Sequence, residues 1–590
     1  MKILELYRLY RQHIGNKFYI LFVMQLLSAL FEGVGIALVL PLLSRFGTSG
    51  GGSNDSDFIE NILEKIGLPT SDNWLVILIV LAFYSKAIIL FLNGAYQAKI
   101  TSHLEYEVRK DVITAMNGSD FSAFSTFNSG HYMNLIISQV KKAMFAFSLS
   151  VIIVSGMLYS LVFLGLAFWL NWSFAALVIL LGSGALFVFR YIGRKVKRIS
   201  TKDVEANNKL GQLCVQYISG FKYLKATQKM DAVLAHLFEV MQKLKEYFYK
   251  KQLASAFSQA INEPILLTVL VAAVFISVNY FEAVVSTLLV SILVIYRALG
   301  RMMKVQGSWQ ALMAEAGSVE FLLTESKRFK EEFEVSGVEK PKNSEKMLTF
   351  ENVSFNYPSG EKAIRNVSFT VKRNETLAIV GESGSGKSTL LDLITAIQKP
   401  TSGTIFYLDI PNDQVDLINW RSRIGYVTQD VLMFDDSIRN NVTLWDAENA
   451  ETIEAKLKNS IEMANASDFI LGKEVGLSSE IGDRGLKLSG GQKQRISIAR
   501  ELYKEPEILI LDEATSALDT ESEKVIKESI DKLKGSLTVI LVAHRLSTVQ
   551  NADKIIVMDK GSILEQGDYE SLVQAKGRFY DMVTLQNMKT

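Results

Sequence analysis

The stretch Gly381-Glu382-Ser383-Gly384-Ser385-Gly386-Lys387-Ser388 fits the phosphate-binding pattern G-x-x-x-x-G-K-[ST]. The apolar run 378–380 leads into it, and residues 389–394 lead out of it with the spacing of a helix. Glycines let a backbone wrap closely around phosphate oxygens, and the following helix directs its positive end toward them. The stretch therefore predicts a strand, a phosphate loop and a helix, in that order.

The side chains of this loop suit a nucleoside triphosphate such as ATP, bound with Mg²⁺. Lys387 is expected to reach the β- and γ-phosphates, and the Ser388 hydroxyl is expected to hold the Mg²⁺ ion. The loop residues expected to contact the nucleotide are Gly381, Ser383, Gly384, Gly386, Lys387, Ser388 and Thr389.

Two acidic residues follow an apolar, strand-like run further along the chain. Residues 508–511 read Ile-Leu-Ile-Leu, and Asp512 and Glu513 come directly after them. Asp512 suits the role of a Mg²⁺ ligand, and Glu513 suits a general base that polarises the attacking water. Tyr357, thirty residues before Lys387, offers an aromatic face on which an adenine ring could stack.

A second glycine motif, Leu488-Ser489-Gly490-Gly491-Gln492, precedes a helix-like segment that is rich in basic residues. Ser489 and the backbone N–H groups of Gly490, Gly491 and Gln492 are expected to form another anion site. The first loop already accounts for the phosphates of one ATP. We therefore expect the second site to serve the ATP of another subunit.

Composition divides the 590-residue chain into two unlike halves. Residues 1–325 carry long apolar runs, residues 326–346 form a charged linker, and residues 347–590 read as a soluble α/β domain. The net charge of +1 argues against nucleic acid as the main partner. The single cysteine, Cys214, excludes an internal disulfide and a cysteine-ligated metal site.

Six segments of the first half are read as membrane spans, each of which takes about 20 apolar residues. The connections after the second and fourth segments are long and rich in Lys and Arg, which places them and the nucleotide half in the cytoplasm. Both connections also have a helical pattern, so we expect the helices to extend well beyond the bilayer. The expected spans are residues 18–43, 74–92, 145–170, 172–191, 264–280 and 283–299.

Charged residues lie in or beside these spans. A charge at the bilayer centre costs about 2.5–3.5 kcal/mol on insertion scales, so each such residue should face a cavity or a partner. Lys86 and Arg301 are expected to reach an interface by snorkelling. Glu32 and Arg297 lie deeper and are candidates to line a cavity.

The connection between the first two spans contains a segment with apolar residues on one helical face. Residues 58–66 place Phe58, Ile59, Ile62, Leu63 and Ile66 together. This pattern predicts a short amphipathic helix that lies on the outer lipid surface or packs on the spans.

With these motifs in this order, the second half resembles the ATPase domain of ABC transporters, and the whole chain resembles an ABC half-exporter. The resemblance implies an α-helical six-span membrane domain joined to an α/β P-loop ABC ATPase domain. It also implies that Gln429 senses Mg²⁺ and the membrane half, that His544 contacts the γ-phosphate, and that Asp519 links two ATP sites. One departure is Asp483, where the family more often has glutamate.

One chain has one phosphate loop and one segment of the Ser489 type, so completing an ATP site needs two chains arranged head to tail. We expect a homodimer with two ATP molecules, although a heterodimer remains open. Hydrolysis of ATP would then drive transport across a membrane.

Three details resemble bacterial lipid-linked oligosaccharide flippases: residues 31–41, the segment 58–66, and Tyr296-Arg297-Ala298-Leu299. The resemblance implies that Arg297 and Arg301 meet the pyrophosphate of a lipid carrier in a bacterial cytoplasmic membrane, with Glu32 as a further substrate-site candidate. Bidentate phosphate contact suits arginine. The alternatives are an exporter of other lipids, hydrophobic drugs or peptides, and a membrane-tethered ATPase that regulates a partner.

Overall fold

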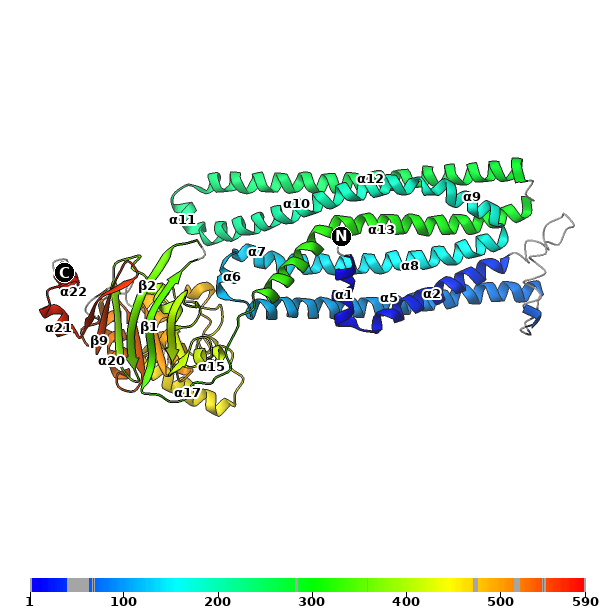
Figure 1. The fold of residues 1–590 in the computed structure, drawn as a ribbon. Helices are drawn as coiled ribbons and strands as arrows, with labels where there is room; N and C mark the ends of the chain where they lie inside the picture. The colour runs from blue at the N-terminus through cyan, green and yellow to red at the C-terminus, as the bar shows by residue number, and fades with distance from the viewer. Residues whose placement is uncertain are drawn as a thin grey trace. The chain divides into compact units, whose positions relative to one another are not determined.

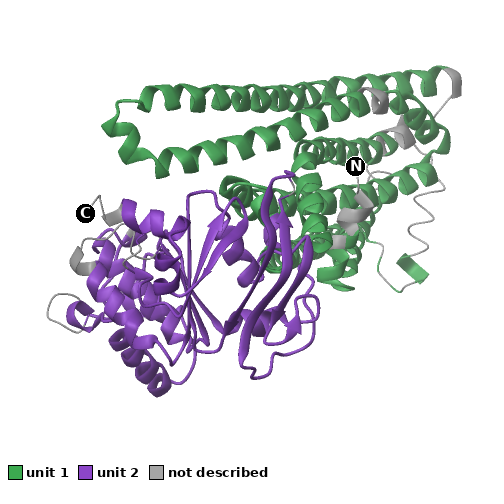
Figure 2. Cartoon of the chain, turned by 60° about the vertical axis from the view of Figure 1, so that its left-hand side comes forward, with its two compact units in different colours: residues 1–119, 123–333 green, residues 120–122, 334–590 purple. Residues whose placement is uncertain are grey.

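The computed structural model describes residues 3–39, 63–65, 67, 69, 71–281, 285–357, 359–470, 476–513, 520–543, 545 and 548–587. The chain separates into two compact units (Figure 2). Unit 1 comprises residues 1–119 and 123–333, and unit 2 comprises residues 120–122 and 334–590.

Unit 1 is built from helices, several of them far longer than a membrane is thick (Figure 1). The helix α12 has 52 residues, which corresponds to about 78 Å, against a hydrocarbon core of about 30 Å. The predicted extension of the spans beyond the bilayer is therefore confirmed. The helices are α1 (Ile3–Ile14), α2 (Lys17–Ala37), α5 (Asp72–Asn117), α6 (Phe121–Ser125), α7 (Ser129–Met133), α8 (Val140–Leu170), α9 (Trp172–Ser183), α10 (Ala185–Ser219), α11 (Phe221–Ala226), α12 (Met230–Phe281) and α13 (Val285–Glu331), with a π-helical turn at Asn134–Gln139.

Four of the described helical segments are long and apolar enough to cross a bilayer: Lys17–Ala37, Asp72–Asn117, Ser129–Leu170 and Met230–Asn279. The predicted fourth span, 172–191, is divided, because α9 ends at Ser183 and α10 begins at Ala185. Gly184 lies at this break and Gly182 is two residues before it, and glycine is a poor helix former. The predicted amphipathic helix at 58–66 lies largely outside the described residues.

Small residues let three helices of unit 1 cross closely. A Cβ atom on Gly130 of α7 would lie 2.4 Å from the backbone nitrogen of Gln212 in α10. Further along α10, the Ser200 hydroxyl accepts a hydrogen bond of 3.0 Å from the backbone N–H of Gly317 in α13. These contacts tie α7, α10 and α13 into one packed bundle.

Unit 2 contains two sheets with an apolar core. The larger sheet has the strand order β10-β9-β3-β8-β7-β6, in which β9, β3, β8, β7 and β6 run parallel. The smaller sheet, β2-β1-β4-β5, is antiparallel. The strands are β1 (Lys346–Asn356), β2 (Lys362–Lys372), β3 (Thr376–Gly381), β4 (Ser402–Tyr407), β5 (Ile410–Pro411), β6 (Ile424–Val427), β7 (Ile508–Asp512), β8 (Thr538–Val542), β9 (Lys554–Asp559) and β10 (Ser562–Gly567).

The helices of unit 2 are mostly short, and two of them matter for the nucleotide site. The helix α14 follows the phosphate loop, and α19 follows Ser489. The helices are α14 (Lys387–Ile394), α15 (Leu417–Ser422), α16 (Ile438–Thr443), α17 (Ala450–Met463), α18 (Ser467–Ile470), α19 (Gly490–Tyr503), α20 (Thr520–Leu533), α21 (Tyr569–Gln574) and α22 (Arg578–Asn587), with a 3₁₀ turn at Asp483–Gly485.

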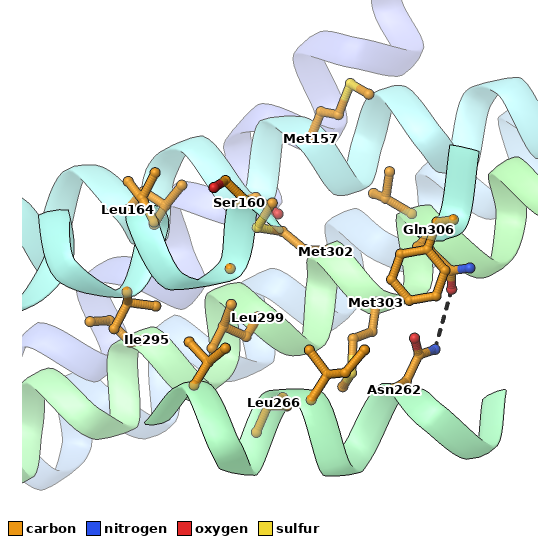
Figure 3. A pocket seen from close by; sticks show the side chains of 18 of the residues that line it. Met157, Ser160, Leu164, Asn262, Leu266, Ile295, Leu299, Met302, Met303 and Gln306 are labelled. Carbon is orange, nitrogen blue, oxygen red and sulfur yellow. Dashed lines mark hydrogen bonds between the residues drawn. The ribbon is translucent and has the colours of Figure 1, made fainter. Parts of the chain in front are cut away.

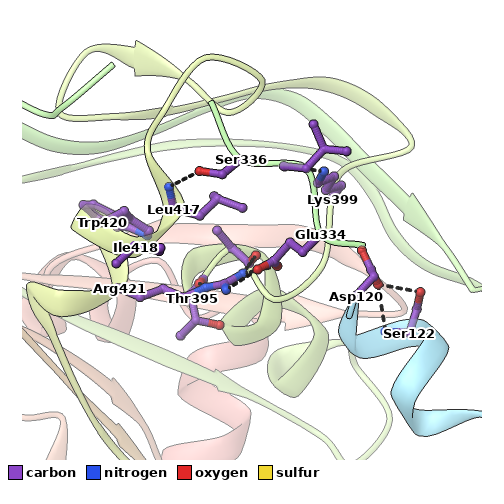
Figure 4. A network of polar contacts seen from close by, with 12 residues as sticks. Asp120, Ser122, Glu334, Ser336, Thr395, Lys399, Leu417, Ile418, Trp420 and Arg421 are labelled. Carbon is purple, nitrogen blue, oxygen red and sulfur yellow. Dashed lines mark hydrogen bonds and ion pairs between the residues drawn. The ribbon is translucent and has the colours of Figure 1, made fainter. Parts of the chain in front are cut away.

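The segment that follows α13, residues 334–341, is bound to unit 2 along its length (Figure 4). Arg421 of α15 donates to both carboxylate oxygens of Glu334, at 2.7 and 2.5 Å. Lys399 donates to the carbonyl of Val335 at 2.9 Å, and the Ser336 hydroxyl accepts from the N–H of Leu417 at 2.9 Å. We call residues 334–341 the strap. Part of the region that sequence alone indicates as a charged linker is thus held against unit 2.

Candidate functional site

The phosphate loop has the predicted order of elements. Strand β3 ends at Gly381, and α14 begins at Lys387. Gly386 has a φ of +101°, and a Cβ atom there would lie 2.7 Å from the carbonyl oxygen of Ala363. Both the backbone conformation and the space therefore require glycine at this position. Ser383, Gly384 and Ser388 are exposed along the loop.

Lys387 is buried with its ammonium group curled back onto the loop. Its Nζ atom donates to the carbonyl oxygens of Gly381 and Glu382, at 2.9 Å each. Burial lowers the pKa of Lys387, while the nearby carboxylates of Glu513 and Asp512 oppose this shift. The ammonium group of Lys387 therefore lies within electrostatic reach of Glu513 and Asp512. A site that binds both phosphates and a metal cation needs positive and negative groups close together in this way.

Gln429 and the two acidic residues meet at one edge of the larger sheet. The neighbouring parallel strands β6 and β7 end at Val427 and Asp512, so the residues that follow them emerge side by side. The Gln429 amide nitrogen donates to Glu513 Oε2 at 2.6 Å. Glu513 itself has a φ of +50°, a left-handed conformation that few side chains adopt. Such backbone strain is often found at functional sites.

Tyr357 lies next to the helix that follows the loop. Its hydroxyl shares a hydrogen bond of 2.9 Å with the hydroxyl of Thr389, and its ring packs edge-on against Phe355 at 5.0 Å between centroids. The tyrosine is therefore anchored beside the phosphate loop. Its contact with an adenine ring stays a prediction.

Ser489 caps the helix α19 in a reciprocal arrangement. Its hydroxyl accepts from the N–H of Gln492 at 3.3 Å, and the Gln492 side chain accepts from the N–H of Ser489 at 2.9 Å. Ser489 and Gly490 are exposed, so the start of α19 is accessible to another molecule. The basic residue Arg500 faces inward instead, where its Nε donates to the carbonyl of Asn441 at 2.6 Å.

Two residues near Asp512 were missed by sequence reasoning. The Tyr426 hydroxyl lies 3.5 Å from Asp512 Oδ2. Burial, with the Asp512 carboxylate adding to it, raises the pKa of Asp392 from 3.8 to about 6. A signal was present, because Asp392 follows Ser388 by four residues and therefore shares its face of α14.

The structure leaves three of the predicted residues without a described side chain. Asp519 and His544 lie outside the described residues, so their places near the site stay predictions. Asp483 belongs to the described 3₁₀ turn, but its side chain is not described.

A second group of charges lies within the helices of unit 1. Glu32 of α2 is fully buried, and its Oε2 atom lies 2.9 Å from Lys86 Nζ and 3.0 Å from Arg301 Nη2. Arg297 Nη1 lies 3.7 Å from the other oxygen, Oε1. Snorkelling to an interface was the wrong expectation for Lys86 and Arg301, because a buried carboxylate draws both inward.

We call Glu32, Lys86, Arg297 and Arg301 the charge cluster. It joins α2, α5 and α13, and α8 contributes Tyr159, whose ring lies 4.3 Å from the guanidinium of Arg301. The Tyr159 hydroxyl in turn donates to Ser28 at 2.6 Å. Three cationic groups face one carboxylate, which leaves the cluster with a net charge of plus two.

Two family models match this chain, and they fall on the two halves. Residues 21–301 match the ABC transporter transmembrane region, and residues 364–516 match the ABC transporter family. A full-length relative, an ATP-dependent lipid A-core flippase of Acinetobacter baylyi, is 30% identical over 95% of this chain and 97% of its own. The chain belongs to the ABC transporter family.

The organisation of this ABC transporter is that of a half-exporter, with one membrane unit and one ATPase unit. Other relatives include the heterocyst differentiation ATP-binding protein HepA of Nostoc sp., which is 29% identical over 95% of this chain and 92% of its own. An ATP-dependent lipid A-core flippase of Aliivibrio fischeri is 28% identical over 95% of this chain and 94% of its own.

The fold of this ABC transporter also matches a solved structure. A bacterial Atm1-family ABC exporter with ATP bound superposes with a TM-score of 0.83, at 22% identity, over 97% of this chain and 99% of that one. The predicted fold class, a helical membrane domain joined to an α/β ATPase domain, is confirmed. The chain is an ATP hydrolase coupled to transport.

Proposed function

We propose that this exporter moves an amphiphile with a phosphate-bearing headgroup, such as a lipid-linked oligosaccharide or another glycan-lipid, outward across a bacterial cytoplasmic membrane. It acts as a homodimer that binds two ATP molecules with Mg²⁺. The charge cluster supports this substrate class, because it places a net positive charge among the helices of unit 1.

The energetics of a membrane interior favour an anionic partner for this cluster. A buried charge without compensation is costly, and the Glu32 carboxylate offsets only one of three cations. Arg297 is half exposed, so its guanidinium can turn toward a ligand while Glu32 keeps hold of Arg301 and Lys86. A phosphate or diphosphate headgroup would supply the missing negative charge, and arginine binds it in bidentate fashion.

The names of the relatives agree with a lipid substrate. Two of the relatives described above are lipid A-core flippases. A lipid A core, like a lipid-linked oligosaccharide, is a lipid that carries a glycan. We carry only this shared character over to the present chain.

The oxygen ligands at the sheet edge suit Mg²⁺. Ser388 offers an exposed hydroxyl, Asp512 a carboxylate and Gln429 an amide oxygen, and hard oxygen donors of this kind are the ligands that Mg²⁺ prefers. When bound, Mg²⁺ neutralises charge on the phosphates. Lys387 would bind the β- and γ-phosphates, and Glu513 would take the proton of the attacking water, with Gln429 orienting its carboxylate.

Two chains would complete each ATP site. The exposed start of α19, with Ser489 and Gly490, is available to the phosphate loop of a second copy. ATP held between the two ATPase units would favour the state in which they are together, and hydrolysis would release them. This is a population shift driven by tighter binding of ATP to one state.

Proteoliposomes test the substrate class. A fluorescent lipid-linked diphosphate oligosaccharide is placed in the membrane, and ATP-dependent loss of its accessibility to an impermeant quencher is measured. We expect movement by the wild-type protein, and at least about tenfold less by Arg297→Gln/Arg301→Gln, since two charge-assisted phosphate contacts are lost. An exposed arginine of unit 2, Arg365→Gln, serves as the control.

Other outcomes would overturn the proposal. Substrate-stimulated ATP hydrolysis without movement would indicate a regulatory ATPase. Movement of neutral hydrophobic compounds, unaffected by the arginine substitutions, would indicate an exporter of another class.

A further inference from the structure

Unit 1 contains a cavity of about 930 Å³ between α8, α9, α10, α12 and α13 (Figure 3). Its walls are mainly aliphatic and thioether side chains, such as Leu164, Leu266 and Leu299 with Met302 and Met303. A cavity of this size is within the range of small-molecule sites, and an apolar cavity is not stably filled by water. Its natural occupant is therefore apolar.

The cavity is accessible from the surface of the described chain. Met157, Leu161, Ile179 and Met302 contribute to its lining and are also exposed large hydrophobic residues. Within a membrane, such a surface meets hydrocarbon chains rather than water. An acyl chain can therefore enter from the side without leaving an apolar environment.

The polarity of the lining changes along the predicted spans. Met157 to Leu164 lie in the middle of the span 145–170, whereas Arg190, Asn262, Gln306 and Trp309 lie at or beyond the cytoplasmic ends of their spans. Asn262 donates to Gln306 at 3.3 Å, so these two amides satisfy each other (Figure 3). Tryptophan and arginine at this depth are typical of the headgroup level.

Arg190 supplies the charge at this end. It is exposed, lines the cavity and makes no ion pair with any residue that the structure describes. An arginine at the cytoplasmic headgroup level attracts anionic lipids. The cavity thus combines an apolar body with a cationic end, which is the complement of an anionic lipid.

This site is distinct from the charge cluster. Along α13 the cavity is lined by Ile295, Leu299 and Gln306, whereas Arg297 and Arg301 belong to the cluster. Residues two positions apart on a helix point about 200° apart. Most of the lining residues of α13 therefore point away from Arg297, whereas Val305, which also lines the cavity, lies one helical turn from Arg301.

We propose that the cavity binds an acyl chain of an anionic phospholipid from the cytoplasmic leaflet, with the lipid phosphate at Arg190. The chain lies along α12 and α13 from Gln306 toward Ile295, and the headgroup stays at the cytoplasmic surface. This lipid is a bound component of the membrane unit and not the transported substrate. The site can exist whether or not the charge cluster binds a headgroup.

Two matched glycine substitutions test the site. Gly182 lines the cavity, Gly165 lies on α8 outside it, and a Cβ atom on either would have open space around it. The purified full-length protein is reconstituted with phosphatidylglycerol that carries a photoactivatable group in its acyl chain. After illumination, labelling of the peptide that contains Met302 and Met303 is quantified by mass spectrometry.

We expect Gly182→Phe to lower this labelling about tenfold, because the phenyl ring displaces several methylene groups of the chain. Gly165→Phe should leave it at the wild-type level. Leu266→Trp, which also fills the cavity, and Leu267→Trp, which changes an exposed neighbour, provide an independent pair. Equal labelling in all four variants would overturn the proposal.

The headgroup part is tested with a neutral lipid. Arg190→Gln should lower labelling by phosphatidylglycerol several-fold toward the level of photoactivatable phosphatidylcholine, and labelling by the neutral lipid should not change. Equal labelling by the two lipids in the wild-type protein would overturn the role of Arg190. If Gly182→Phe instead dissociates the dimer in light scattering and the wild-type cavity is unlabelled, a second copy of the chain fills the cavity and the proposal is wrong.

Discussion

At the scale of single residues, burial controls the charges of the nucleotide site. Lys387 has a lowered pKa because it is buried, yet two carboxylates at the end of β7 offset part of that effect. Gln429 fixes Glu513 through a hydrogen bond of 2.6 Å. The site therefore holds Lys387 and the proposed base, Glu513, in place before any phosphate arrives, and such preorganisation favours catalysis.

Glu513→Gln should separate binding from turnover. ATP binding should stay close to the wild-type level, because the loop and Asp512 are unchanged, while phosphate release falls at least about a hundredfold through loss of the general base. Steady-state phosphate release and equilibrium ATP binding by the purified dimer measure the two effects. The control is Glu351→Gln, an exposed residue on β1. Near-normal release by Glu513→Gln would disprove the assignment of the base.

Asp392→Asn should change how stability depends on pH. The pKa of Asp392 is raised to about 6 in the folded protein from 3.8, so the carboxyl holds its proton more tightly when folded. Its ionisation therefore destabilises the fold progressively as pH rises from about 4 to about 6, and fully above that range. Asparagine cannot ionise, so the variant should gain stability over the wild type at pH 8 and gain less at pH 5.

The apparent midpoint of thermal unfolding of the protein, followed by tryptophan fluorescence at both pH values, measures this gain. Asp413→Asn, an exposed aspartate of the same unit, is the control and should show no such pH dependence. An advantage of Asp392→Asn that is equal at pH 5 and pH 8, or greater at pH 5, would contradict the raised pKa.

Residues in motifs were predictable, whereas residues that act through long-range packing were not. The phosphate loop, Gln429 and the acidic pair follow local patterns, and the structure brings them together. Lys86 and Arg301 were misread, because their partner Glu32 is 269 positions from Arg301 along the chain. Only the fold reveals such a pair.

At the scale of elements, the strap is held to the rest of unit 2 by hydrogen bonds and an ion pair. Charge-assisted, bidentate hydrogen bonds such as those of Arg421 and Glu334 are stronger than neutral ones. Gly337 permits a close approach, since a Cβ atom there would lie 2.0 Å from the backbone of Gln414. The strap is therefore a bound part of unit 2 and not a free tether.

Arg421→Gln should loosen the strap. Trypsin cleavage after the exposed Lys342 should become several-fold faster, because proteolysis requires local release of the backbone. Digestion of the folded protein under native conditions, followed by mass spectrometry, gives the rate. Arg365→Gln should leave the rate unchanged. If both variants were cleaved at the wild-type rate, the ion pair would not hold the strap.

Elements with a strong period were easier to predict than their boundaries. The strand before the phosphate loop and the long helices α5 and α12 were expected from their patterns. The break between α9 and α10 was not, because helix propensity decides it locally within an otherwise apolar run. The strap carries mostly charged and small residues, so its sequence reads as a linker until its contacts are known.

At the scale of the whole molecule, the proposed transport cycle requires two chains that share each ATP. In the dimer, the phosphate loop of each chain would face Ser489 of the other chain. Ser383 lies in the phosphate loop and Ser489 at the start of α19, and both are exposed. Each is therefore a suitable position for a cysteine that reports on its half of the shared site.

Disulfide cross-linking can show whether the phosphate loop of one chain lies next to Ser489 of the other. Cysteines replace Ser383 and Ser489 in a Cys214→Ser, Glu513→Gln background, and the protein is oxidised with and without ATP and Mg²⁺. With a shared ATP site, we expect a covalent dimer on a non-reducing gel that depends on ATP and is lost on adding Lys387→Ala. An intrachain cross-link alone, or ATP binding at full affinity by a chain that stays monomeric and uncross-linked, would contradict it.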